Sequence, residues 1–413
     1  MSFCIFSSNQ HYSWFLRSLV IGVALLLGAV AFANWLVDPY AIFSPPPIRG
    51  VNGNKPEFVA HLRLTHPYAI ERLQPEGLIL GTSRAGQGLS PTHRMWRGLN
   101  VYNAAYPSVS LYEMWRTLQH AQAIHPLRVV VLGLDNRVFY ADRDGNGTFS
   151  EARMRVDAAN VRQHNFLSAR LPDLAASLLS TDALLSSLRT VRFQNWSPLT
   201  LGSRGEWTRL SDSYDYEQAF RTMTSNTFER YRKYSAEPFA LERAVEPLFE
   251  IMMLCHRERI DLKLLIPPAH AWHWEAMRIA GMQDRFDAIK RAIVATNQRA
   301  AKVANAAPYP VWDYSGYVGP NTEKLPETHT AKMHWFWETV HFKPALGDRI
   351  LDNVLAKVPN TELGRDPYGA EIDVNNIEQH LVAWRQAQRN YEHTHSHDLA
   401  IIEALHTEWQ RRR

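Results

Sequence analysis

The stretch Arg128-Val-Val-Val-Leu-Gly-Leu-Asp135 (RVVVLGLD) is the most strand-like in the chain, because an unbroken apolar run leads directly into a glycine. Apolar runs that do not alternate with polar residues are typical of strands that are covered on both faces. Similar short runs occur before and after it in the sequence. They are EGLILGTS at 76–83, LNVYNAA at 99–105, DLKLLIPP at 261–268 and PYPVWDYS at 308–315.

Helical patterns separate these runs, at Leu111–Ile124, Ala244–Glu258 and Met282–Val303. Strands that alternate with helices of this length indicate βαβ units, and βαβ units build a parallel sheet. We therefore predict an α/β protein, a three-layer sandwich with a parallel sheet.

The segment at about 140–240 breaks the alternation, with an amphipathic helical run over Leu171–Val191 and a loop-rich stretch after it. It is too long for a plain crossover, so we predict a large insertion that forms a cap or wall beside the site. Residues 361–413 read as a helical tail with a polar, histidine-containing joint. The α/β domain then spans 45–360.

Composition excludes several classes of protein. Of the 413 residues, 46% are hydrophobic and 21% charged, which excludes a disordered chain, collagen or a coiled coil. A net charge of +4 is too small to indicate nucleic acid as a partner. The 2 cysteines exclude a disulfide scaffold and a cysteine-based zinc site. We expect no metal and no cofactor.

An apolar segment lies near the N-terminus, where Leu19–Ala33 carries no charge. With its flanks, residues 14–37, it is long enough to cross a hydrocarbon core of about 30 Å as a helix. We predict a single transmembrane anchor in a bacterial-type inner membrane. Residues 1–13 would be cytoplasmic, with Arg17 on the inner side, and the body would be periplasmic. The alternative is a cleaved signal peptide ending at Ala31-Phe-Ala33, which also exports the body.

A candidate nucleophile follows the first predicted strand, in Gly81-Thr-Ser-Arg84. Active sites of open α/β sheets collect at the carboxyl ends of strands, so Ser83 is placed to attack a substrate. The alternative is that Ser83 only caps the next helix. Arg84 could hold a substrate carboxylate or form a surface salt bridge.

A candidate base and its orienting acid lie near the end of the α/β part, in Trp337-Glu-Thr-Val-His341. A serine nucleophile needs a base, and the base needs a carboxylate. Glu338 and His341 can supply both if they sit on a tight turn just before a helix. Otherwise they are neighbours on a solvated helix face. A lone Glu-x-x-His motif does not make a di-iron site, which needs two such motifs.

Polar side chains follow three other predicted strands. Asn103 follows the second, and Asp135 and Asn136 follow the third. Such groups can donate to an oxyanion, or they can form turns with their own backbone. His270 follows the fourth strand, where it could contact substrate or cap a loop.

The order of these motifs resembles the SGNH/GDSL hydrolase superfamily. The resemblance implies that Ser83 is the nucleophile, His341 the base and Glu338 the acid, with the oxyanion near Asn103 and Asp135 or Asn136. The chain departs from the family pattern in three places. Thr82 and Glu338 stand where the family has Asp, and Asp135 stands where it has the oxyanion Asn.

With the anchor, the chain is similar to the membrane-anchored partners of membrane-bound O-acyltransferases, such as the proteins of alginate and cellulose acetylation and of teichoic-acid D-alanylation. This implies a serine esterase or O-acyltransferase acting on an acyl ester of an envelope or secreted polysaccharide, with a membrane-bound O-acyltransferase as a possible partner. The departures leave open a non-catalytic polymer-binding or scaffold partner of such an enzyme. Tryptophans near the last two predicted strands could fill the core or stack on a sugar: Trp272, Trp274, Trp312, Trp335 and Trp337.

Overall fold

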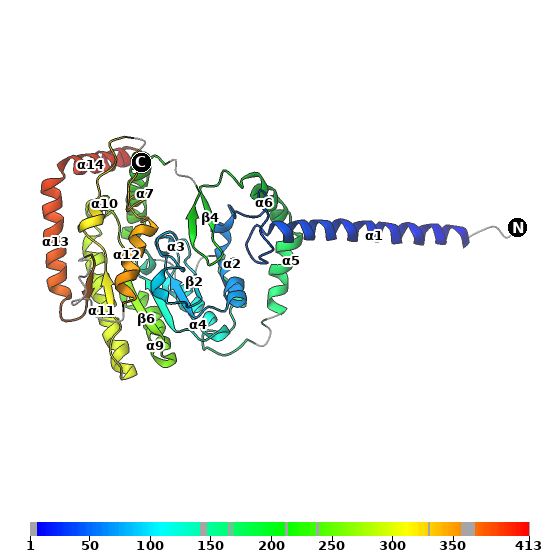
Figure 1. Ribbon diagram of the computed structural model, residues 1–413, viewed down its shortest axis with the longest axis horizontal. Helices are drawn as coiled ribbons and strands as arrows, with labels where there is room; N and C mark the ends of the chain where they lie inside the picture. The colour runs from blue at the N-terminus through cyan, green and yellow to red at the C-terminus, as the bar shows by residue number, and fades with distance from the viewer. Residues whose placement is uncertain are drawn as a thin grey trace.

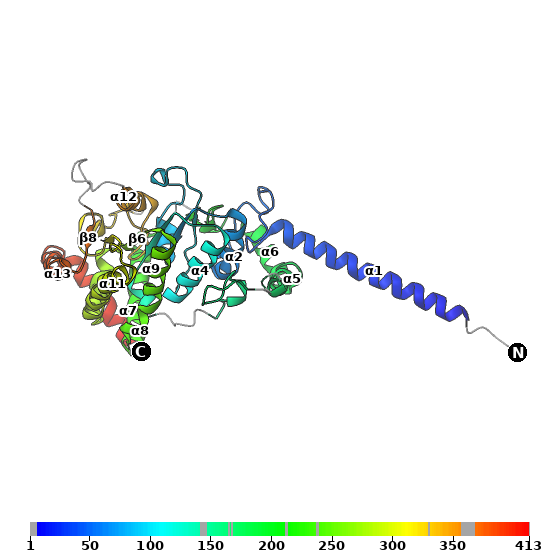
Figure 2. The same ribbon diagram turned by 90° about the horizontal axis from the view of Figure 1, so that it is seen from below.

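The computed structural model in Figures 1 and 2 describes residues 6–140, 147–163, 166, 168–210, 214–236, 239–328, 331–356 and 368–412. Its centre is a six-stranded sheet in the order β2-β1-β3-β6-β7-β8. All of these strands except β8 are parallel to one another, so the predicted α/β class is confirmed. The strands are β1 (Gly77–Leu80), β2 (Val101–Asn103), β3 (Val129–Gly133), β6 (Asp261–Ile266), β7 (Val311–Asp313) and β8 (Ala370–Ile372).

The strand β8 differs from the expectation that residues 361–413 are purely helical. It pairs antiparallel with β7, with Val311 opposite Ile372. A three-residue strand is too short to show a periodic pattern, so no run of residues indicated it in advance. The sheet therefore extends beyond the predicted domain limit at residue 360.

The unbroken apolar strands are explained by burial of both faces of the sheet. Leu78 and Leu80 of β1 belong to one hydrophobic cluster, while Ile79 between them belongs to another. Successive side chains of a strand point to opposite faces, so each face needs its own cover. Helices α4 and α9 cover the first face, and α12 covers the second.

The predicted helices are present with small shifts at their ends. The helix α4 has the predicted bounds, whereas Leu171–Val191 is two helices that break at Ser180, which caps the second. A two-stranded ribbon, β4 (Leu199–Leu201) and β5 (Trp207–Arg209), follows them. The helices are α1 (Phe6–Val37), α2 (Phe58–Leu73), α3 (Ser83–Gly88), α4 (Leu111–Ile124), α5 (Leu171–Leu179), α6 (Thr181–Arg192), α7 (Tyr216–Ala236), α8 (Leu241–Ala244), α9 (Glu246–Glu258), α10 (Ala271–Ile279), α11 (Gln283–Ala304), α12 (Pro344–Val354), α13 (Ile377–Thr394) and α14 (Ser396–Arg411).

The N-terminal helix α1 projects away from the body (Figures 1 and 2). Its segment Tyr12–Val37, 26 residues long, is long and apolar enough to cross a membrane. The C-terminal end of α1, which adjoins the body, is hydrogen-bonded to α5 and α6. Asn34 Nδ2 donates to the Leu178 carbonyl at 2.9 Å, and Ser187 Oγ donates to Asn34 Oδ1 at 2.7 Å. The first part of the predicted insertion therefore braces this helix.

Candidate functional site

The order of the strands determines where the site lies. In the order β2-β1-β3-β6-β7 the direction of winding reverses between β1 and β3. Open α/β sheets bind ligands at the carboxyl ends of the strands at such a switch point. Ser83 follows β1 and Asp135 follows β3, so both lie at this edge.

The nucleophile candidate Ser83 is the first residue of α3, not its cap. Thr82 is the N-cap, with its Oγ1 accepting from the Arg84 backbone N–H at 3.3 Å. The alternative expectation, that Ser83 only caps the next helix, is therefore wrong. Because Thr82 takes this task, the Ser83 hydroxyl is left available for other partners.

Glu338 and His341 lie on a tight turn ahead of α12. The Trp337 N–H donates to the His341 carbonyl at 2.9 Å, and the Lys343 N–H donates to the Trp335 carbonyl at 2.7 Å. The alternative prediction, that Glu338 and His341 are neighbours on a solvated helix face, is wrong, since the turn is not helical and Glu338 is buried.

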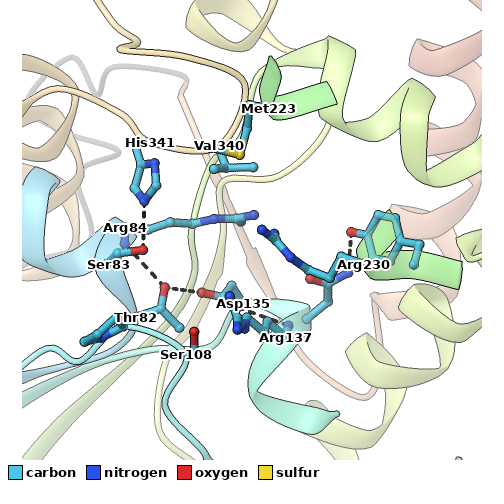
Figure 3. Close-up of a pocket in the computed structure, with 13 residues that line it drawn as sticks. Thr82, Ser83, Arg84, Ser108, Asp135, Arg137, Met223, Arg230, Val340 and His341 are labelled. Atoms are coloured by element: carbon cyan, nitrogen blue, oxygen red, sulfur yellow. Dashed lines mark hydrogen bonds between the residues drawn. The ribbon is translucent and has the colours of Figure 1, made fainter. Parts of the chain in front are cut away.

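The turn places His341 between Ser83 and Glu338. Figure 3 shows the hydrogen bond between the His341 ring and Ser83. The ionised Glu338 carboxylate can only accept, so His341 Nδ1 carries the proton and donates to Glu338 Oε1. His341 Nε2 is then the acceptor for Ser83 Oγ, at 2.7 Å. The arrangement has the connectivity of a serine nucleophile, a base and an orienting acid.

The environment of Glu338 favours its charged form. Burial opposes the charge, but His341 and the backbone N–H groups of Val340 and His341 outweigh it and lower the pKa of Glu338 below its ordinary value. The Val340 N–H donates at 2.8 Å. A carboxylate held in this way fixes both the tautomer and the orientation of the imidazole.

Close packing between α3 and α12 holds the two halves of the site together. A Cβ atom on Gly347 of α12 would overlap the Gly88 carbonyl of α3, and a Cβ on Gly88 would overlap the ring of Phe342. Only glycine permits this approach, and Phe342 directly follows His341 in the chain. The glycines therefore set the distance between Ser83 and His341.

Asn103 lies outside the candidate site. Its Nδ2 donates to the carbonyls of Ala85 at 3.0 Å and Leu89 at 2.9 Å, and its Oδ1 accepts from the Ala105 N–H. Asn103 is fully buried and does not line the cavity at Ser83. The structure places this side chain as a support for α3 and not as an oxyanion donor, which corrects the expectation.

Asp135 and Asn136 do line the cavity, but their side chains are engaged with the protein. Asp135 accepts from the hydroxyl of Thr82 and from the Arg137 N–H. Asn136 Nδ2 donates to the Tyr231 hydroxyl at 2.8 Å. Neither side chain has the free donor that an oxyanion requires, so the structure does not support that expectation.

His270 belongs to the fold and not to the cavity. Its Nε2 bonds to the Glu323 carbonyl at 2.7 Å, and its Nδ1 accepts from the Trp272 N–H at 3.3 Å. Burial lowers its pKa to about 4, so the ring is neutral at pH 7. Of the two readings of His270, loop capping agrees with the structure.

A cavity of about 150 Å³ opens at Ser83 and His341. Arg84 lines it, together with residues that the sequence did not single out, namely Ser108, Arg137, Met223, Arg230 and Tyr231. Helix α7 of the insertion supplies the last three, which agrees with a wall beside the site. These residues come from separate segments, and no local pattern links them. Ser108 has a positive φ of 55°, which sequence alone does not reveal.

The five tryptophans differ in their exposure. Trp272, Trp274 and Trp312 are buried in the core, whereas Trp335 and Trp337 are partly exposed. The Trp337 ring lies under the Lys343 ammonium, 4.3 Å from its centroid. One face of this ring is thus already in contact with a cation.

Comparison of the chain with protein-family models, curated proteins and solved structures gives no significant match. Within the described residues, no group of three or more His, Cys, Asp or Glu side chains could hold a metal ion. The fold and the site together define a doubly wound α/β protein in which Ser83, His341 and Glu338 form a hydrogen-bonded chain at the switch point of the sheet.

Proposed function

We propose that the protein is a membrane-anchored serine esterase or O-acyltransferase of the SGNH type, with its α/β body on the periplasmic side of the inner membrane. Its substrate would be an acyl ester, acetyl or similar, of a cell-envelope or secreted polysaccharide. The observation that carries the proposal is the 2.7 Å contact of Ser83 Oγ with His341 Nε2, with Glu338 behind the ring.

The chemistry follows from the positions of the protons. Ser83 Oγ attacks the acyl carbonyl while its proton passes to His341 Nε2, and the imidazolium is stabilised by Glu338. The protonated Nε2 then gives its proton to the departing alcohol, which leaves an acyl group on Ser83. A sugar hydroxyl or water, deprotonated by His341, attacks this ester and restores the serine. Transfer differs from hydrolysis only in which hydroxyl takes the acyl group.

The oxyanion of each step requires N–H donors close to Ser83. The Ser83 backbone N–H lies at the first position of α3, where no acceptor within the helix is available. This group can take the role for which the side chains of Asn103 and Asn136 are not free.

Covalent labelling with a fluorophosphonate tests the proposal on the full chain in detergent. The wild type should be labelled and should hydrolyse a small acetyl ester, and Ser83→Ala should lose both activities. Ser90→Ala is the matched control, because Ser90 lies just beyond α3 and bonds to Thr92 instead of lining the cavity. A wild type that shows neither Ser83-dependent labelling nor Ser83-dependent turnover would overturn the proposal.

One observation favours a second candidate, a non-catalytic polymer-binding or scaffold partner of a membrane-bound O-acyltransferase. The amide groups of Asn103 and Asn136 are bonded to the protein and not free for an oxyanion. For this candidate, Ser83→Ala should leave binding of an acylated polysaccharide unchanged in a sedimentation assay. An acyl group that becomes bound to Ser83 during turnover would exclude it.

A further inference from the structure

The cavity at Ser83 is rich in positive charge. Three guanidinium groups line it: Arg84 of α3, Arg137 in the segment after β3, and Arg230 of α7. Among the described residues that line it, Asp135 alone is acidic. Its two carboxylate oxygens already accept from Thr82 and from a backbone N–H.

The three arginines form no ion pair with a carboxylate in the described part of the chain. Their positive charges act on one another and on nearby groups. Burial is the main cause of a lowered pKa at Arg137; Arg230 and Arg84 lower this pKa further, whereas Tyr234 and Asp135 raise it. Burial followed by the charges of Arg84 and Arg230 likewise lowers the pKa of His273 well below its ordinary value. Among the described residues that line the cavity, three positive charges therefore face the single negative charge of Asp135.

Arg84 is held in place for recognition. It is buried, and Figure 3 shows its side chain extending from the Ser83 side into the middle of the cavity. Its Nη2 contacts His273 Nε2 at 3.4 Å. His273 Nε2 also accepts a hydrogen bond from the Tyr231 hydroxyl at 3.1 Å. Asn136 in turn donates to that hydroxyl. A guanidinium held by such a network loses little freedom when a ligand binds.

Burying like charges together is costly unless a counter-charge arrives. Arginine offers paired N–H donors that match the two oxygens of a carboxylate or phosphate. We propose that this cavity binds an anionic group, a carboxylate or a phosphate, carried by the ester on which Ser83 acts. This inference rests on the proposed function and narrows its substrate to an ester with a negative charge close to the acyl group.

Matched esters test the proposal on the full chain. The substrates are 4-acetoxybenzoate, the neutral 4-acetoxybenzamide, and 4-acetoxyphenyl phosphate. Each kcat/KM is divided by the rate at which hydroxide hydrolyses the same ester, which removes differences in leaving group. The wild type should prefer an anionic ester by about tenfold or more, as expected for hydrogen bonds to charged groups. Comparison of the carboxylate with the phosphate shows which anion the cavity prefers.

Arg230→Gln should reduce this preference about tenfold. Arg230→Lys should retain part of it, because the charge remains while the paired geometry is lost. The matched control is Arg232→Gln on the same helix, since Arg232 pairs with Glu229 at 2.7 Å and does not line the cavity. Arg137→Gln gives an independent test if Arg230→Gln does not fold.

The possible failures can be distinguished. If Ser83→Ala retains the hydrolysis of every ester, the proposed function fails. If hydrolysis depends on Ser83 but the wild type shows no preference for charge, the anion site alone is overturned. An equal loss of preference in Arg230→Gln and Arg232→Gln would also overturn it, because the effect would then come from overall charge.

A separate observation concerns helices α5 and α6, which lie where α1 meets the body (Figures 1 and 2). The distribution of apolar and polar residues on α6 is the reverse of that on an ordinary surface helix. Its buried residues are small or polar, whereas its large apolar residues face outward. The buried set is Ala183, Ser186, Ser187 and Thr190, and the exposed set, which we call the outer face, is Leu185, Leu188 and Val191.

Further apolar groups continue the outer face. Leu171 and Leu179 of α5 are exposed, and Trp196, beyond the end of α6, is 76% exposed. Apolar surface on this scale is costly in water and typical of a contact with protein or lipid. Arg189 and Arg192 in the last turn of α6 are exposed beside it.

The membrane-spanning candidate α1 indicates what covers this surface. Asn34 of α1 bonds to both helices, so the outer face lies beside the point where α1 leaves the body. Helices with an apolar face, arginines and tryptophan lie in the headgroup region of bilayers. We infer that α5 and α6 rest in the membrane interface, with the outer face of α6 against lipid.

Site-directed fluorescence tests this inference in proteoliposomes with the full chain. An environment-sensitive dye is attached at Leu188→Cys in a Cys4→Ser background, since the remaining Cys255 is buried. The matched control is Val303→Cys, an exposed valine at the end of α11. Lipids with a nitroxide near the headgroup should quench the dye at position 188 at least several times more than the dye at 303.

Equal quenching at the two positions would overturn the inference. A position 188 that is shielded only when a second membrane protein is added would also overturn it, because a protein would then cover the outer face.

Discussion

At the scale of single residues, Glu338 shows how a glutamate can hold the histidine where the pattern expected from the sequence has an aspartate. A glutamate is one methylene longer than the usual aspartate, and here it lies on the same turn as the histidine. Its carboxylate accepts from His341 and from two N–H groups of its own turn. The longer side chain is therefore curled back over the turn, which keeps it close to the imidazole.

Glu338→Gln removes the charge that stabilises the imidazolium and weakens the control of its tautomer. We expect the rate of Ser83 labelling by a fluorophosphonate to fall by up to about 10⁴-fold, as when the carboxylate of a Ser-His-Asp triad is replaced by its amide. Glu338→Asp should recover part of this rate. Thermal denaturation of each variant shows whether the fold is intact. A Glu338→Gln rate within a few-fold of the wild type would mean that the carboxylate does not assist the base.

At the scale of elements, the contact between α3 and α12 decides the geometry of the site. Gly88 and Gly347 allow two helices to approach to backbone contact, and Asn103 ties the end of α3 to the sheet. Neither contact adds a chemical group to the cavity. Both determine whether the serine and the histidine meet.

Gly347→Ala should lower both stability and reactivity. The added methyl group must displace α12 or α3, and overpacking of this kind costs about 1–3 kcal/mol. The displacement carries His341 away from Ser83, so labelling should slow as the melting temperature falls. Gly147→Ala is the control, because no atom of the described residues lies within 4 Å of the added Cβ. A Gly347→Ala variant as stable and reactive as Gly147→Ala would show that the contact is not required.

At the scale of the whole molecule, buried neutral histidines couple stability to pH. His66 bonds to the Tyr102 hydroxyl at 2.8 Å and to the Ala105 carbonyl at 3.0 Å. Burial lowers its pKa to about 4, and burial does the same for His270. In the unfolded chain both would return to about 6.5.

These shifts predict acid lability. Between about pH 6.5 and 4 the unfolded chain binds protons that the folded chain does not, so stability falls as the pH is lowered through this range. Unfolding of the full chain in detergent at pH 7.5, 5.5 and 4.5 measures the effect. His270→Gln should show a shallower loss, and the exposed His397→Gln should show the same loss as the wild type. Stability that stays constant or rises towards pH 4.5 would contradict the prediction.

Much of the fold was predictable because its signals are local. Each of the five parallel strands is an apolar run, and a helix such as α4 shows its period and capping residues within its own segment. Glu338 and His341 could be paired from sequence because they share one turn. The break between α5 and α6 and the short strand β8 were missed, since too few residues carry their pattern.

By itself, the sequence determined the class of the fold, the apolar N-terminal helix and the side chains that follow each strand. Only the tertiary structure decided which of these meet. Ser83 and His341 are 258 residues apart, and the packing of α3 on α12 brings them together. The tertiary structure also engages the Asn103 side chain in hydrogen bonds to the α3 backbone, away from the cavity. It places Arg84, Arg137 and Arg230 around one cavity. The physical reason is that hydrogen bonds and charges act through space, whereas the sequence records only neighbours along the chain.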